Sequence, residues 1–481
     1  MQGSCVYDSV VRSGVSRTER YPGTRSSEEG ENQFMESRTA REAGWNYSNY
    51  NLFAEEPELG KIAWLNTFSG SCSEFSREEY LQTQQILDFP EDDPLIGHYA
   101  KRGLITRKDE KEELRKIFSE ACERENALLL TICPTLACNF DCPYCFEKHI
   151  PGRMTPEVMD NVVRFVQRLT EKHSFRTLSV LWFGGEPLLG LDIIESLSAR
   201  LIALAEEHGM EYQAQIITNG YLLNEHAVDV LERGKVNKVQ ITLDGLAESH
   251  NKTRHLTNGG GTFDVITENI RRQKIPFLVD VRFNVIRENR SEVEPLWRFL
   301  DELAEKSGNN ITYYASPAFE NDAAKERNSR DVSLLQGEEN SEYVYKDALK
   351  TFLSKRMGLC DALKKYALTF DHEGNVYCCG QKVGNPSELY ANIRDYDPDD
   401  GDRTSVHPEI NHYYQNLGDI FADCGDCVFL PRCRGECPAK RRTGAPECPE
   451  YKDHPDAYVL HIVRSLKERK KKRKSSSENN G

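Results

Sequence analysis

The stretch Ala127-Leu-Leu-Leu-Thr-Ile-Cys133-Pro-Thr-Leu-Ala-Cys138-Asn-Phe-Asp-Cys142-Pro-Tyr-Cys145 decides the fold. Its first half is a short apolar run, which is typical of a buried strand in a parallel sheet. Its second half places three cysteines in the loop that follows. Thiolates are soft ligands that suit zinc or iron–sulfur clusters. Three cysteines on a four-iron cluster would leave one iron open, whereas a zinc site would need a fourth ligand such as His149.

Strands alternate with helices along residues 125–320, the part of the chain that contains this loop. One expected helix is Pro156–Glu171, with Thr155 as N-cap and Pro156 in the first turn. Six strand–helix repeats predict an α/β fold with a parallel sheet and right-handed crossovers, curled into a partial (β/α)6 barrel. A functional site is expected at the carboxyl ends of the strands. The expected strands are 127–133, 177–183, 211–218, 237–243, 277–286 and 310–316.

Two of these strands carry polar side chains on alternate positions, where the face should point into the barrel. They are Gln240, Thr242 and Asp244 in the fourth strand, and Asp280, Arg282 and Asn284 in the fifth. Buried polar groups need partners. A polar lumen therefore predicts a polar occupant, with a self-satisfied polar network or solvated strand ends as the alternative.

The N-terminal part divides into an arm and a small domain. Residues 1–45 are rich in Ser, Gly, Arg and Glu and predict a disordered arm. Residues 46–124 predict three strands and three helices, which together make a winged-helix-like domain. Ser76 with Glu79 is a capping-box signature for the first helix. The expected strands are Asn51–Ala54, Lys61–Phe68 and Ser71–Phe75, and the later helices are Leu95–Arg102 and Lys108–Arg124.

A second cysteine array occupies the C-terminal part. We expect a polar linker over 321–345, a helix from Glu342 to Lys355, a loop-rich domain over 346–452 and a basic tail over 453–481, which is helical after Tyr458. The domain has too few apolar residues to fold on packing alone, which favours a metal scaffold. A zinc ribbon would leave three of its thiols idle. The thiols are Cys360, Cys379, Cys424, Cys427, Cys433, Cys437 and Cys448.

Composition narrows the class of protein. The net charge of −15 disfavours nucleic-acid binding, because phosphate attraction needs a basic face; the run Lys467 to Lys474 is the exception. We find no apolar stretch that could span a membrane and no signal peptide. A cytoplasmic location follows as an expectation, and there the 15 cysteines favour metal binding over disulfides.

The first cysteine array, followed by Phe146-Glu147, resembles the radical SAM superfamily over about residues 125–320. Gly184-Gly185-Glu186-Pro187 and Thr218-Asn219-Gly220 follow in the order typical of that family. The resemblance implies a [4Fe–4S] cluster on Cys138, Cys142 and Cys145, S-adenosylmethionine (SAM) on its open iron, and reductive cleavage of SAM to a 5′-deoxyadenosyl radical. It also implies SAM contacts at Tyr144, Phe146, Gly184, Gly185, Glu186, Asn219, Thr242, Asp244 and Arg254. The two glycines would let the backbone approach the ligand closely.

The second array resembles the SPASM extension of radical SAM peptide-modifying enzymes, which implies two auxiliary [4Fe–4S] clusters and three clusters in all. The first auxiliary cluster would take Cys360, Cys379 and Cys437, and the second would take Cys424, Cys427, Cys433 and Cys448. The first set is one ligand short. Cys378 is available, but adjacent side chains in a strand point opposite ways, which favours an iron open to a substrate thiolate.

The N-terminal domain resembles the element that recognises leader peptides, to which a leader adds a strand. Taken together, these resemblances predict a radical SAM oxidoreductase that crosslinks a ribosomally made, Cys-containing precursor peptide. A thioether ranks before a carbon–carbon bond, and a flavodoxin or ferredoxin would be the reductant. The residues alone do not assign a catalytic base. The alternatives are a formylglycine-forming enzyme similar to anaerobic sulfatase-maturing enzymes, and a non-catalytic metal-binding protein that binds DNA.

Overall fold

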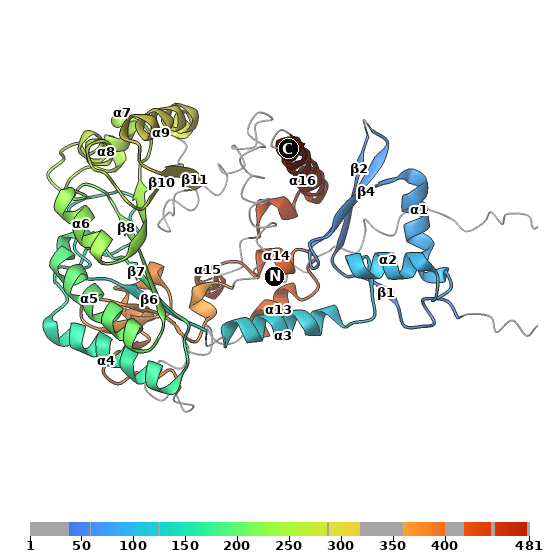
Figure 1. Cartoon of the computed structure of the whole chain (residues 1–481), viewed down its shortest axis with the longest axis horizontal. Helices are drawn as coiled ribbons and strands as arrows, with labels where there is room; N and C mark the ends of the chain where they lie inside the picture. The colour runs from blue at the N-terminus through green and yellow to red at the C-terminus, as the bar shows by residue number, and fades with distance from the viewer. Residues whose placement is uncertain are drawn as a thin grey trace, which may run out of the picture.

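The structure is a computed structural model that describes residues 38–57, 59–123, 126–285, 288–317, 359–399, 418–443 and 448–478. A large sheet with its helices lies at one end of the molecule and a small N-terminal unit lies at the other (Figure 1). Segments from the C-terminal part, including α13 (Gly418–Cys424), α14 (Leu430–Cys433) and α15 (Pro438–Thr443), lie between them. The predicted linker 321–345 and helix 342–355 lie outside the described residues.

Six parallel strands form the centre of the large sheet, and each pairs with the next one along the chain. The predicted strand positions are confirmed to within one residue at each end. The central parallel sheet of the α/β prediction is therefore confirmed. The strands are β6 (Ala127–Ile132), β7 (Thr177–Trp182), β8 (Glu211–Thr218), β9 (Val236–Thr242), β10 (Leu278–Val285) and β11 (Ile311–Pro317).

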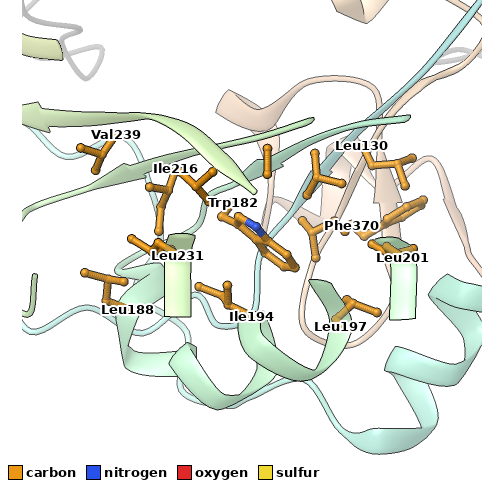
Figure 2. Close-up of a cluster of buried hydrophobic side chains, with 14 of the residues drawn as sticks. Leu130, Trp182, Leu188, Ile194, Leu197, Leu201, Ile216, Leu231, Val239 and Phe370 are labelled. Atoms are coloured by element: carbon orange, nitrogen blue, oxygen red, sulfur yellow. The ribbon is translucent and has the colours of Figure 1, made fainter. Parts of the chain in front are cut away.

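Amphipathic helices cover this sheet. Helix α4 begins at Pro156, where the Thr155 side chain accepts a hydrogen bond from the Val158 N–H, as predicted. Figure 2 shows the indole of Trp182 from β7 lying above Ile194 and Leu197 of α5. Each such buried side chain stabilises the fold by about 2 kcal/mol. The helices are α4 (Pro156–Lys172), α5 (Leu191–Glu207), α6 (Glu225–Arg233), α7 (Ala247–Thr253), α8 (Phe263–Arg272) and α9 (Val293–Ser307).

The sheet continues beyond β6 into the C-terminal part of the chain. Strand β12 (Ala367–Phe370) pairs with β6 in parallel, and β13 (Asn375–Tyr377) and β14 (Ala391–Asn392) follow in antiparallel. Phe370, Val376 and Ile393 are buried in the same core as the first six strands. The prediction that residues 346–452 lack the apolar residues to pack is therefore wrong for this segment, because they join an existing core instead of building one.

The N-terminal unit has the predicted order of three strands and three helices. Strands β2 (Asn51–Glu56), β3 (Lys61–Asn66) and β4 (Cys72–Ser76) form an antiparallel sheet. Helices α1 (Arg77–Gln85), α2 (Pro94–Arg102) and α3 (Glu110–Cys122) follow it. The capping box of Ser76 and Glu79 is confirmed at α1. A short pair that the sequence did not predict, β1 (Asn46–Tyr47) with β5 (Ile105–Thr106), joins the unit.

One predicted boundary is wrong. The disordered arm is expected to reach residue 45, but Ala40 is fully buried and its N–H donates to the Phe89 carbonyl. The basic tail, expected to be helical after Tyr458, is helix α16 (Pro455–Glu478), and its apolar side packs against the N-terminal sheet (Figure 1). In the described part of the chain, we find no helix with the length and apolarity to cross a membrane.

Candidate active site

A cavity of about 480 Å³ lies at the carboxyl ends of the parallel strands. Its wall contains the first cysteine array, Cys138, Cys142 and Cys145. It also contains three thiols that lie more than 200 residues further along the chain: Cys360, Cys379 and Cys437. The pairing of β12 with β6 explains this convergence, because it brings the C-terminal segment to the strand that precedes the first array. We call these six thiols the inner group.

The first cysteine loop is held by contacts with buried neighbours. The Phe140 N–H lies 3.4 Å from the Cys138 sulfur, and the Phe140 ring is buried. The Asn219 side chain donates to the Asn139 side chain at 2.7 Å, which ties the loop to the end of β8. These contacts hold the loop through the chain's own residues.

The glycines of the Gly184-Gly185 pair face this loop. A Cβ on Gly184 would lie 2.3 Å from the Thr135 carbonyl oxygen, and one on Gly185 would lie 2.4 Å from that of Ala137. Gly184 also has a φ of +110°. Both residues line the cavity. The close approach of the cysteine-loop backbone therefore requires glycine at both positions.

The predicted SAM contacts divide into two sets. Tyr144, Phe146, Gly184, Gly185, Asn219, Thr242 and Arg254 line the cavity. Glu186 and Asp244 are buried behind the wall and are not among its lining residues. The Glu186 carboxylate accepts hydrogen bonds from the Thr218 hydroxyl at 2.7 Å and the backbone N–H groups of Asn219 at 2.7 Å and Leu188 at 2.9 Å. In this structure Glu186 therefore fixes the end of β8.

A polar network joins the cysteine loop to the strand ends. The Tyr144 hydroxyl donates to Asp244 and accepts from Arg254 at 3.0 Å. Asn284 lies 3.3 Å from the same hydroxyl. Two atoms of the network, Asp244 Oδ1 and Arg254 Nε, are buried without a hydrogen-bond partner among the described residues. Buried polar atoms without partners are rare, so this corner fits a polar ligand.

Burial controls the charge state of the thiols in the first array. It raises the pKa of Cys138 to about 12 and that of Cys145 to about 11. Burial also raises the pKa of Cys142, and the positive charge of Arg254 opposes this rise. Metal ligation needs thiolates, so a cluster bound here would displace protons from all three residues. The three thiols and the nearby cation fit an iron–sulfur cluster.

The C-terminal thiols of the inner group also lie close to one another. Burial raises the pKa of Cys360 to about 11, with smaller contributions from charge on Cys379 and Cys437. Cys378 lines the cavity as well. Strand β13 ends at Tyr377, so the alternation expected for Cys378 and Cys379 does not apply. Both residues line the cavity, so strand alternation does not decide between them as ligands.

The remaining four thiols, Cys424, Cys427, Cys433 and Cys448, are not among the lining residues of the cavity. We call them the outer group. Burial raises the pKa of Cys427, and charge on Cys424 and Cys448 raises it further, so these thiols are neighbours. Partly buried Cys427 contacts the residues that join α3, α13 and the N-terminal sheet. The outer group therefore lies where the two ends of the chain meet.

Sequence reasoning missed three charged residues at these sites. Glu147 lines the cavity; burial raises its pKa to about 8, and its Oε2 has no partner among the described residues. Arg441 and Lys452 donate to the sulfurs of Cys424 and Cys448. The signal for Lys452 was its position only four residues after Cys448 in the chain. His149 Nε2 lies 3.7 Å from the Cys145 sulfur. Across the described ranges, no three His, Cys, Asp or Glu side chains converge on one metal ion.

Comparisons with known proteins show which family and which relatives this chain resembles. Residues 132–300 match the model of the radical SAM superfamily. The radical SAM cyclopropyl synthase TigE of Paramaledivibacter caminithermalis is 26% identical over 42% of this chain and 43% of its own. The PqqA peptide cyclase of Gluconobacter oxydans is 25% identical over 35% of this chain and 44% of its own. The matches thus span less than half of these relatives' lengths.

A solved structure supports the fold. The structure titled native anSMEcpe with bound AdoMet and Cp18Cys peptide has a TM-score of 0.50 at 20% identity. The match covers 71% of this chain and 98% of that chain. A radical SAM domain implies one [4Fe–4S] cluster and SAM, and the thiols and polar atoms around the cavity fit both. The chain therefore carries a radical SAM domain over residues 132–300.

Proposed function

We propose that this chain is a three-cluster radical SAM enzyme of the SPASM type that oxidises a Cys-containing precursor peptide and crosslinks it. The observation that carries the proposal is the single cavity whose wall holds both Cys138–Cys145 and the thiols of Cys360, Cys379 and Cys437. Cys138, Cys142 and Cys145 would hold the cluster that, with SAM, would supply a carbon-centred radical for hydrogen abstraction from the peptide. Three thiols of the second array, Cys360, Cys379 and Cys437, face the same space and would meet the same substrate.

The chain's own residues have positioning roles in this proposal. Arg254 is a cation on the cavity wall, and its Nε, which has no partner among the described residues, is suited to a carboxylate. The Tyr144 hydroxyl holds the Arg254 guanidinium in place: it accepts from Arg254 and donates to Asp244. Gln240, Thr242 and Arg282 line the wall on the strand side and would orient a polar peptide backbone.

A thioether ranks first among the products because the inner C-terminal set offers three thiols for a cluster that needs four ligands. A substrate thiolate would complete the set. Cys378, on the same wall, is the chain's own candidate for that place. If Cys378 fills the fourth place on the cluster, a carbon–carbon bond becomes the first-ranked product. Formylglycine is the alternative for a substrate without a crosslink acceptor. The likeness to anSMEcpe is one of fold and does not choose between them.

We further propose that the N-terminal unit holds the leader of the precursor at the edge of β4. Strand β4 pairs with β3 on one side only among the described residues. The Asn66 N–H donates to the Ser71 carbonyl at 2.8 Å, so Asn66 and Ser71 form a hydrogen-bonded pair. Such pairs alternate along an antiparallel ladder, which makes Ala63 and Glu74 a non-hydrogen-bonded pair. The backbone N–H and C=O of Glu74 therefore face outward. An outward-facing edge accepts an added strand.

The experiment is iron and product analysis of anaerobically reconstituted protein. The wild type should hold about twelve iron atoms in three four-iron clusters. Replacing Cys138, Cys142 and Cys145 with Ala should reduce this to about eight and abolish 5′-deoxyadenosine formation. Cys72→Ala, a cysteine outside both arrays, is the matched control and should change neither. About four iron atoms in the wild type, or SAM cleavage by the triple variant, would contradict the proposal.

A further inference from the structure

Two cations contact the sulfurs of the outer group. Arg441 Nη2 lies 2.9 Å from the Cys424 sulfur, and Lys452 Nζ lies 3.0 Å from the Cys448 sulfur. In the first array, by contrast, the Cys138 sulfur is met by amides: the Phe140 N–H at 3.4 Å and the Asn219 side chain at 4.0 Å. Cations therefore donate to the sulfurs of Cys424 and Cys448, whereas neutral amides reach the sulfur of Cys138.

The Arg441 contact is fixed in place. Its Nε donates to the Gly435 carbonyl at 2.5 Å and its Nη1 pairs with Asp423 at 2.8 Å. The side chain of Arg441 is 5% exposed, whereas that of Asp423 is 57% exposed. Solvent screens the carboxylate more than the guanidinium, so Asp423 neutralises the cation only in part. The sulfur of Cys424 keeps a buried positive neighbour.

We propose that Arg441 and Lys452 are positioning residues that raise the reduction potential of the second auxiliary cluster. This inference rests on the proposed function, which places that cluster on the outer group. One-electron reduction adds a negative charge to a cluster, and a cation that donates to a ligand sulfur stabilises the reduced form more than the oxidised form.

The location of the outer group gives this tuning a purpose. Its thiols are not among the lining residues of the cavity, so a substrate in the cavity does not ligate this cluster. Its contribution is then to hold an electron, and a raised potential makes it the favoured holder among the clusters. The buried Arg441 contributes more than Lys452, because Cys448 is exposed and solvent screens the second pair.

The test is an EPR-monitored redox titration of the full, reconstituted chain. Arg441→Gln should lower the ratio of reduced to oxidised outer cluster about tenfold at a fixed potential. This corresponds to a fall of 59 mV in the midpoint potential for one electron. Lys452→Gln should lower that ratio about threefold, with the effect falling as salt rises. Arg441→Lys keeps the charge and should recover part of the wild-type value.

The control is Lys111→Gln. Lys111 pairs with Asp426, which lies between Cys424 and Cys427 in the chain, so this variant removes an exposed charge nearby without removing either of the two sulfur donors. It should leave the midpoint unchanged. An unchanged midpoint in Arg441→Gln with about twelve iron atoms bound would overturn the assignment. If Arg441→Gln loses the cluster, Lys452→Gln becomes the test. An unchanged midpoint in Lys452→Gln would then overturn the assignment. A wild type without a third cluster would instead overturn the three-cluster function.

Discussion

The inner and outer groups of thiols are built from the same residue in two different settings. The inner group lies at the strand ends of the large sheet, around a cavity with buried polar atoms that have no partner in the described part of the chain. The outer group lies where α3, α13, α16 and the N-terminal sheet meet, with Arg441 and Lys452 on its sulfurs. The first setting suits chemistry on a bound substrate, and the second suits the storage of charge.

The two groups also depend on different parts of the fold. The inner group needs the pairing of β12 with β6, which belongs to the central sheet. The outer group needs the packing of the C-terminal helix on the N-terminal unit, where Tyr458, Val459 and Ile462 are buried against Ala54 and Leu65. Perturbing one framework should therefore leave the other group largely intact. Two variants test this independence, and a third tests the N-terminal unit on which the outer group depends.

The largest effect is expected from Gly185→Ala. The new Cβ would lie 2.4 Å from the Ala137 carbonyl oxygen and 2.5 Å from that of Leu136, and backbone atoms cannot move aside without displacing the cysteine loop. We expect loss of about four iron atoms and a fall of about 100-fold or more in 5′-deoxyadenosine formation, as misplaced groups cause. The outer cluster should keep its EPR signal.

The matched control is Gly97→Ala in α2, where a Cβ meets no atom within 4 Å. It should be neutral or stabilise by about 1 kcal/mol, because Ala is the better helix former. Iron content and SAM cleavage measure both variants. If Gly185→Ala retains SAM cleavage, the glycine pair does not fix the loop and the inner group is less constrained than its geometry indicates.

A smaller effect is expected from Ile462→Ala in α16. The side chain is fully buried, so its removal should lower the free energy of unfolding by about 2 to 4 kcal/mol. The loss should appear as earlier release of iron from the outer group during urea titration, while 5′-deoxyadenosine formation persists. Glu468→Ala, an exposed position on the same helix, is the control. Simultaneous release of all iron would show that the two frameworks unfold as one unit.

The smallest effect on the clusters is expected from Glu74→Pro at the edge of β4. Proline removes the outward N–H that an added strand would use but is tolerated at a sheet edge. Affinity for the precursor peptide should fall about tenfold with SAM cleavage unchanged. Glu74→Ala removes the ion pairs with Lys61 and Lys467 alone and separates side-chain from backbone effects. Fluorescence anisotropy with a labelled precursor peptide measures the affinity of both variants. An affinity of Glu74→Pro equal to that of the wild type would place the leader elsewhere.

The sequence predicted the features that local pattern encodes. The six parallel strands, the capping box at Ser76 and the N-cap at Thr155 follow from periodicity and short-range hydrogen bonds, which neighbouring residues specify. The spacing of Cys138, Cys142 and Cys145 marked the loop that the structure places at the cavity. Each of these features depends on residues close together in the chain.

The tertiary structure alone decided how distant segments meet. It joined β12 to β6, placed six thiols from two arrays on one wall, and laid α16 on the N-terminal sheet. It also assigned Gly184 and Gly185 to the cysteine loop and brought Arg441 to Cys424. These contacts join residues from tens to hundreds of positions apart, and their energy comes from shared burial and charge. A local sequence period cannot specify such pairings, because it determines which face of a segment is apolar but not which partner covers that face.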